Sequence, residues 1–171
     1  MHIPARLTRS VAACLIVAAL AAAVPASRSD NAWALDASPF DKVLGRWVGE
    51  GRLGVRNSAT EQVKCRVTYL RSGSADELQQ TIRCASSSGS IEVRSTVMHA
   101  EGALTGTWTE LSRSMKGKLT GNVTPRGFRV HIKGESLTAN MDIVVLGTKQ
   151  VIEIQFINSS LIGLTLILDK G

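Results

Sequence analysis

Apolar and polar residues alternate with a period of two from Gly45 almost to the end of the chain, and this feature constrains the fold most. Such alternation is typical of β-strands that bury one face. Groups of Gly, Ser and Asn interrupt it roughly every 8 to 15 residues, as turns do. We therefore predict about ten strands, over residues 46–55, 61–71, 77–86, 91–99, 103–111, 115–123, 127–133, 136–146, 149–157 and 161–168.

The connections between these stretches are too short for a helical crossover, which needs about a dozen residues. The strands are therefore expected to pair antiparallel, each with the next, as an up-and-down meander. A meander of this length closes into a barrel or folds into a sandwich. We favour an all-β barrel of about 8 to 10 strands, because closure removes the exposed edges.

Residues 1–34 have the composition of a secretory signal peptide. A short basic start precedes the apolar run 11–26, which is shorter than the roughly 20 residues that span a bilayer. Cleavage is expected after Ala34, where Ala-Trp-Ala fits the usual pattern, or after Ala26. The mature chain 35–171 is then one exported domain, periplasmic or secreted, without a transmembrane segment.

A short helix is predicted between the signal peptide and the first strand. Ser38 suits its N-cap, Pro39 its first position and Gly45 the position after its end. One helix face would carry Phe40, Val43 and Leu44. A helix of one or two turns is marginal alone, so we expect it to pack on one end of the barrel.

The mature chain has two cysteines, Cys65 and Cys84, which an exported protein is expected to join in a disulfide. They are equally far from the Ser74–Ala75 junction, inside the predicted turn Ser72–Asp76, so a hairpin there would place them directly opposite each other. Opposed residues are close enough for a disulfide. No CxxC or histidine cluster accompanies them to suggest a metal site.

Three arginines are predicted to form a stripe on the outer face. The register that pairs the cysteines also opposes Arg66 and Arg83, and a turn at Ser88-Gly89 would add Arg94 beside Arg83. Like charges directly opposed are destabilising, so the stripe calls for a counter-charge. It is either an anion-binding surface or a solvated face whose long side chains splay apart.

The run GRWVGEG, from Gly45 to Gly51, resembles the first strand of the calycin group of barrels, which includes the lipocalins. Its G-x-W-x-G-x-G pattern is similar to that of the haem-binding nitrobindin family. That resemblance implies a haem held by a histidine from the C-terminal strands. The mature chain offers only His99, at a strand end, and His131, facing solvent, so we expect no cofactor and keep haem as the lesser alternative.

A longer stretch resembles small exported bacterial proteins with no assigned activity. The resemblance covers Lys64 to Gly121, where the segments KCRVTY, LQQTIRCAS and LTGTW recur in this order. This resemblance implies an exported barrel and brings no function with it.

The barrel interior is the candidate ligand site. The alternation turns several larger polar, aromatic and sulfur-containing side chains inward, namely Trp47, Tyr69, Gln80, Ser95, Trp108 and Met141. Inward glycines would either leave room for a ligand or accommodate the tryptophans; they stand at positions 49, 51, 106, 117 and 121.

The hairpin Val151–Leu168 is apolar on both faces, so its outer face needs a cover, such as a second copy in a homodimer.

There is no HExxH, CxxC or Ser-His-Asp pattern, so we expect no enzyme. Net charge falls from +6 to +4 when the signal peptide takes away three arginines and one aspartate, and no clustered basic face with aromatic residues suggests nucleic-acid binding.

We therefore predict a non-catalytic binding module for a small apolar ligand. The alternative is a protein that acts through its surface, on an anionic envelope component or as a protease inhibitor, without an internal ligand. Bacterial protease inhibitors include small exported barrels with a G-x-W start and one disulfide.

Overall fold

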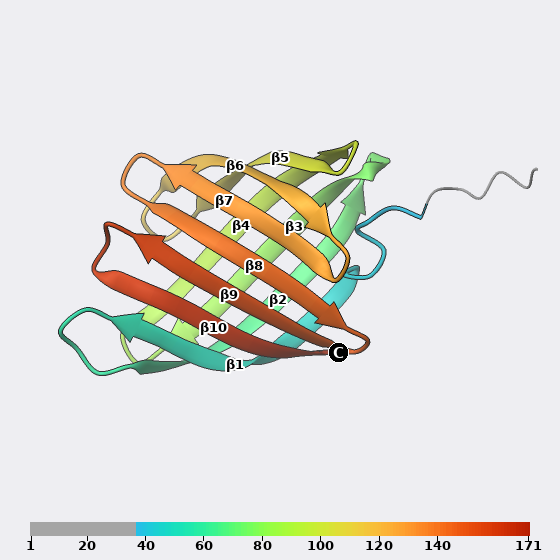
Figure 1. Ribbon diagram of the computed structural model, residues 1–171. Coiled ribbons are helices and arrows are strands. Elements are labelled where there is room, and N and C mark those ends of the chain that lie inside the picture. Colours follow the sequence, from blue (N-terminus) through green and yellow to red (C-terminus); the bar gives the residue numbers. More distant parts are fainter. Residues whose placement is uncertain (1–36) are drawn as a thin grey trace, which may run out of the picture. The chain divides into compact units, whose positions relative to one another are not determined.

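The computed structural model describes residues 37–171 as a closed barrel of antiparallel strands (Figure 1). Each strand pairs with the next one along the chain, and β1 pairs with β10 to close the wall. This confirms the all-β meander and its closure as a barrel. The strands are β1 (Gly45–Val55), β2 (Glu61–Ser72), β3 (Ser74–Ser86), β4 (Gly89–Ala100), β5 (Ala103–Glu110), β6 (Met115–Thr124), β7 (Gly127–Gly134), β8 (Thr138–Leu146), β9 (Lys149–Ile157) and β10 (Leu161–Lys170). The predicted signal peptide, residues 1–34, lies outside the described residues.

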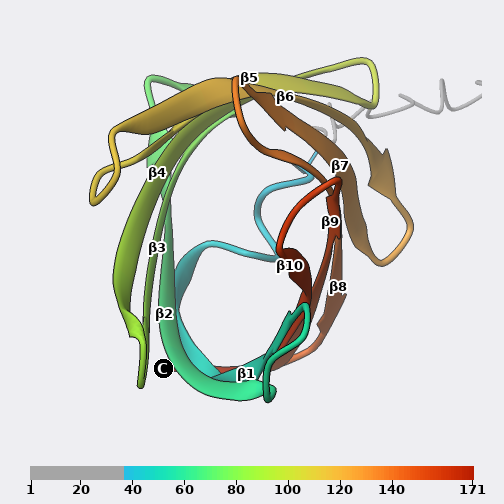
Figure 2. The same cartoon turned by 90° about the vertical axis from the view of Figure 1, so that its left-hand side faces the viewer.

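The hairpin turns alternate between the two ends of the barrel. The turns that follow β1, β3, β5, β7 and β9 lie at one end, which we call the mouth end and which is on the left in Figure 1. Figure 2 looks into this end. The turns that follow β2, β4, β6 and β8 lie at the other end, which we call the closed end, together with the N-terminal segment 38–44.

The core follows the predicted alternation. Side chains at every second position of the strands are buried, because the pleat sends them inside the barrel. Most of the largest fully buried side chains lie at the closed end: Phe40, Val43, Trp47, Val67, Tyr69, Gln150 and Leu168. The other two, Ile152 and Leu166, line the cavity described below.

The first register prediction is confirmed. Cys65 lies directly opposite Cys84 on β2 and β3, and the two form a disulfide with their Cα atoms 4.2 Å apart. Arg66 faces Arg83 in the same ladder. The bridge therefore ties two neighbouring strands inside the barrel.

The second register prediction is wrong by two residues. Arg83 faces Glu92, and Arg94 faces Thr81, because the β3–β4 turn is centred on Ser87 and Ser88 instead of Ser88 and Gly89. A shift of two residues leaves every side chain on its predicted face, so the inward set of β4 is unchanged. The outer arginine row, however, is broken by a carboxylate.

The predicted short helix is not present in the described residues. Residues 39–43 form consecutive turns, with Asp41 N–H donating to the Ser38 carbonyl at 3.0 Å and Val43 N–H to the Phe40 carbonyl at 3.0 Å. Helix nucleation is costly, and Gly45 already belongs to β1 instead of following a helix end. The Val43 carbonyl accepts a hydrogen bond from the Trp47 indole at 2.7 Å, which holds the turns on the barrel.

The inward glycines serve close approach of the strands. A Cβ at Gly49 or Gly51 would lie 2.0 or 1.9 Å from a carbonyl oxygen of β10. At Gly117 a Cβ would meet both the β7 backbone and the Trp108 indole. The same backbone clash occurs at Gly106 and Gly121. These glycines therefore permit strong coiling of the wall, and one of them also makes room for Trp108.

Candidate functional site

The barrel contains a cavity of about 510 Å³ that extends from the mouth end toward the middle. This volume is within the range of small-molecule sites. Most of its wall is apolar, with inward side chains from β1 to β10: Leu53, Val63, Ile82, Val93, Leu119, Ile132, Met141, Ile154 and Leu164 are among them. The cavity is thus a concave apolar site inside a rigid wall.

The N-terminal segment 38–44 covers the closed end of the barrel. Figure 2 shows this segment in blue across the far end of the barrel. Phe40 is buried there, with its ring centroid 5.8 Å from that of Phe128 and 6.2 Å from that of His99. The Ser38 hydroxyl anchors the segment by donating to the Ala75 carbonyl at 2.6 Å.

Four of the six candidate interior residues line the cavity: Gln80, Ser95, Trp108 and Met141. The other two, Trp47 and Tyr69, do not line it, because they are packed in the core of the closed end. The Lys170 ammonium lies 5.4 Å from the Trp47 ring centroid on that side.

A buried polar cluster lies beyond the inner end of the cavity. The Tyr69 hydroxyl donates to Gln150 Oε1 at 3.2 Å. Burial raises the pKa of the Tyr69 phenol to about 12, although hydrogen bonds with Gln80 and Gln150 oppose the rise. The phenol is therefore neutral at physiological pH and acts as a hydrogen-bonding group.

Two buried polar residues of the barrel, Glu110 and Gln150, were not among the predicted site residues. Glu110 lies two residues after the inward Trp108 on β5, and Gln150 lies two residues before the inward Ile152 on β9. The alternation of the strands could therefore have identified both as inward residues. Glu110 lies at the mouth and accepts the backbone N–H groups of Ser112 at 2.9 Å and Arg113 at 2.7 Å. Burial raises the pKa of the carboxyl, but these hydrogen bonds outweigh it and hold the pKa below its usual value.

The mouth also carries Glu61, Ser88 and Arg113. The Ser88 hydroxyl donates to a Glu61 carboxylate oxygen at 2.7 Å and lowers the pKa of that carboxyl. This bond joins the start of β2 to the β3–β4 turn at the rim of the mouth. The charged residues that line the cavity, among the described residues, all lie at this rim: Glu61, Glu110 and Arg113.

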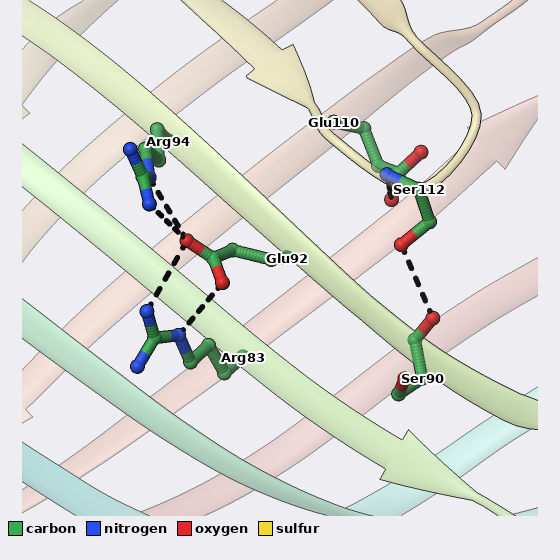
Figure 3. A network of polar contacts seen from close by, with 6 residues as sticks. All are labelled: Arg83, Ser90, Glu92, Arg94, Glu110 and Ser112. Carbon is green, nitrogen blue, oxygen red and sulfur yellow. Dashed lines mark hydrogen bonds and ion pairs between the residues drawn. The ribbon is translucent and has the colours of Figure 1, made fainter.

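The arginine stripe on the outer face is partly neutralised, as Figure 3 shows. Glu92 lies between Arg83 and Arg94, at 2.8 Å from a guanidinium nitrogen of each. The hydrogen bonds from Arg83 and then Arg94 lower the pKa of Glu92. In residues 37–171 no ion pair involves Arg66, so Glu92 reduces the charge of the stripe from +3 to +2 and leaves Arg66 outside the network.

The outer face of the last hairpin carries exposed isoleucines together with the polar residues Glu153, Gln155 and Thr165, so it is only partly apolar. Ile162 and Ile167 are 55% and 56% exposed, and Ile157 is 37% exposed. No helix among residues 37–171 is long and apolar enough to cross a membrane.

The described residues do not suit a histidine-held haem. His99 Nδ1 lies 3.1 Å from an Asp76 carboxylate oxygen, and its Nε2 accepts the Gly102 N–H at 3.1 Å. His131 is exposed and lies 2.9 Å from Asn140 Oδ1. Neither histidine lines the cavity, and no cluster of His, Cys, Asp and Glu in the described residues could hold a metal ion.

Comparison with known proteins gives a structural likeness only. No protein-family model and no curated protein matches the chain. Among solved structures, the barrel is similar to the crystal structure of Rv2717c from M. tuberculosis, with a TM-score of 0.64 and 13% sequence identity over 77% of this chain and 94% of that one. At this identity the likeness shows the shared fold alone.

Proposed function

We propose that this chain is a non-catalytic binding protein that holds a small apolar molecule inside its barrel. The observation that carries the proposal is the cavity of about 510 Å³ with a mostly apolar wall. An interior space of this volume would ordinarily be filled by the protein's own side chains, because protein interiors are close-packed. A closed wall and a covered far end would shield an apolar molecule from water and release it only through the mouth.

The calycin-like type of the barrel is part of this proposal. It is supported by the Gly45–Gly51 run, which opens β1 at the closed end and places Trp47 there in full burial. The buried Trp47 and the N-terminal segment close one end, as a carrier of this type requires.

Export to the periplasm or the medium is also proposed. The basic start and apolar run of residues 1–34 support it, and so does the Cys65–Cys84 disulfide, since such bonds persist in oxidising compartments.

The test is binding of the fluorescent probe N-phenyl-1-naphthylamine to the purified protein. We expect saturable binding that is weakened at least about tenfold in Ile132→Trp/Ile154→Trp, which places two indoles in the cavity. The matched control, Lys133→Trp/Gln155→Trp, adds the same side chains one position away on the outer face. Circular dichroism confirms that both variants are folded, and Ile154→Trp alone provides a milder block.

Equal binding by the blocked and control variants would place the probe outside the cavity and refute the proposal. Absence of any binding by the wild type would do so as well, and would favour the alternative in which the protein acts through its outer surface.

A further inference from the structure

Two neighbouring polar side chains form the floor of the cavity. Gln80 on β3 and Ser95 on β4 are directly opposite each other in the ladder, and both side chains line the cavity. The next inward residues toward the closed end, Leu78 and Val97, do not line it. The polar pair therefore marks the greatest depth that the cavity reaches on these two strands.

The floor has unused hydrogen-bonding capacity. Gln80 and Ser95 are 6% and 8% exposed, and both line the cavity, so their remaining exposure is toward it. Among the described residues no side-chain hydrogen bond involves the Ser95 hydroxyl, and the Tyr69 hydroxyl lies beside the Gln80 side chain. The indole N–H of Trp108, which also lines the cavity, is buried without a partner in the described residues. An amide offers two N–H donors and one acceptor, and a hydroxyl offers one donor and an acceptor. Buried groups of this kind are ordinarily paired, so these point to a partner within the cavity.

The floor carries no charge. Among the described residues, the ionic side chains that line the cavity are confined to the rim, at Glu61, Glu110 and Arg113. A carboxylate or an ammonium group placed at the floor would lose its hydration without meeting an opposite charge, which is costly. A neutral carbonyl, amide or hydroxyl group would instead exchange water for Gln80 and Ser95.

We propose that the cavity selects neutral molecules with an apolar body and one hydrogen-bonding group, which enters first and binds Gln80 and Ser95. This inference rests on the proposed function and adds the ligand class and its direction. The apolar body lies against the aliphatic wall between floor and rim. Fatty acids and other amphiphiles with a charged head are disfavoured in this orientation.

Three naphthalene probes of similar size test the inference: 2-acetylnaphthalene, 2-ethylnaphthalene and 2-naphthoate. The first has a neutral acceptor, the second has none, and the third is charged at pH 7. A neutral hydrogen bond in a buried site corresponds to about a threefold to tenfold gain in affinity. We expect the ketone to bind about that much tighter than the hydrocarbon, and the carboxylate to bind weakest.

Variants of the floor identify the residues responsible. Gln80→Leu and Ser95→Ala should each reduce the preference for the ketone, and together they should abolish it while leaving 2-ethylnaphthalene affinity within about twofold. Ser86→Ala removes a hydroxyl at an inward position of β3 near the mouth, at a residue that lines the cavity, and serves as the matched control, with the ketone preference unchanged. Because Ser95→Ala removes a single oxygen atom, it keeps the test available if Gln80→Leu lowers stability.

The outcomes separate the two proposals. If 2-ethylnaphthalene binds in the cavity but the ketone shows no advantage, or if 2-naphthoate binds tightest, the ligand class is wrong and the binding function stands. If none of the probes binds, including N-phenyl-1-naphthylamine, both proposals fail together.

Discussion

Glu110 is a charged residue that the barrel buries at its mouth, with an exposed fraction of 3%. Its carboxylate closes the β5–β6 turn by accepting two backbone N–H groups, which would otherwise lack partners in the described structure. Figure 3 shows it beside Ser112, whose hydroxyl donates to the Ser90 carbonyl at 3.4 Å. A single residue thus links one turn of the rim to the strands that line the cavity.

Acid should weaken the fold through this residue. The pKa of the folded carboxyl lies below the ordinary 4.5, so its contribution is present above that pH and is lost as the pH falls through the lowered value. We expect Glu110→Gln to cost about 1 kcal/mol of unfolding free energy at pH 7 and much less at pH 3. Urea unfolding at both pH values measures the difference.

Glu135→Gln, at an exposed position in the β7–β8 turn, is the matched control and should change stability little at either pH. An equal loss for Glu110→Gln at pH 3 and pH 7 would show that the charge of Glu110 contributes nothing.

At the scale of elements, the strands were predictable and the segment before them was not. Strong alternation set the strand positions, because each strand buries one face, and the cysteines set the first register. The second register depended on the position of the turn within a run of serines. A turn centred on Ser87 and Ser88 and one centred on Ser88 and Gly89 leave every side chain on the same face, so the alternation could not distinguish them. Residues 39–43 carry helix-like end signals, but their contacts with Phe128 and Trp47 decide their shape.

The N-terminal segment is expected to stabilise the barrel without contributing to the cavity. Phe40→Ala removes a buried ring that packs on Phe128 and should cost about 3 kcal/mol or more. Binding of N-phenyl-1-naphthylamine by the folded variant should change less than about twofold, since Phe40 is not part of the cavity lining.

Thermal unfolding and a probe titration on the same sample measure both effects. Lys42→Ala, at a residue whose ammonium lies 5.6 Å from the Phe128 ring centroid, serves as a nearby surface control. A large loss of binding with unchanged stability would show that the segment belongs to the site.

The cavity was predictable only as an inward face. The sequence indicates which side chains point inward, but the depth at which the cavity ends depends on the N-terminal segment and on how the wall coils. For this reason Trp47 and Tyr69 could not be separated from Gln80 and Ser95 beforehand. The sequence also could not show whether the inward glycines bring strands together or leave empty space. In the structure they bring strands together.

At the scale of the whole molecule, closure depends on the seam between β1 and β10. Trp47 pairs with Lys170 and Leu53 with Leu164, so the seam runs nearly the full height of the wall. Gly51 lies in it where a Cβ would be 1.9 Å from the Thr165 carbonyl oxygen. The seam therefore tolerates no side chain at this position without displacement of a strand.

Gly51→Ala should destabilise the barrel by about 2 kcal/mol or more, because either β1 or β10 must shift. Gly54→Ala on the same strand is the matched control, since its Cβ would meet the nearest atom, in Ile162, at an ordinary 3.4 Å. It should cost less than about 1 kcal/mol. Chemical denaturation of both variants gives the comparison, and equal losses would contradict the close approach at Gly51.

The pairing of the first strand with the last also determines the timing of folding. As the chain is made from its N-terminus, β2 to β9 can each pair with a preceding neighbour, but one edge of β1 stays unpaired until Leu161–Lys170 has emerged. Such an edge can pair with other chains. Nascent chains of this protein therefore carry an aggregation hazard throughout their synthesis, and only arrival of the tenth strand removes it.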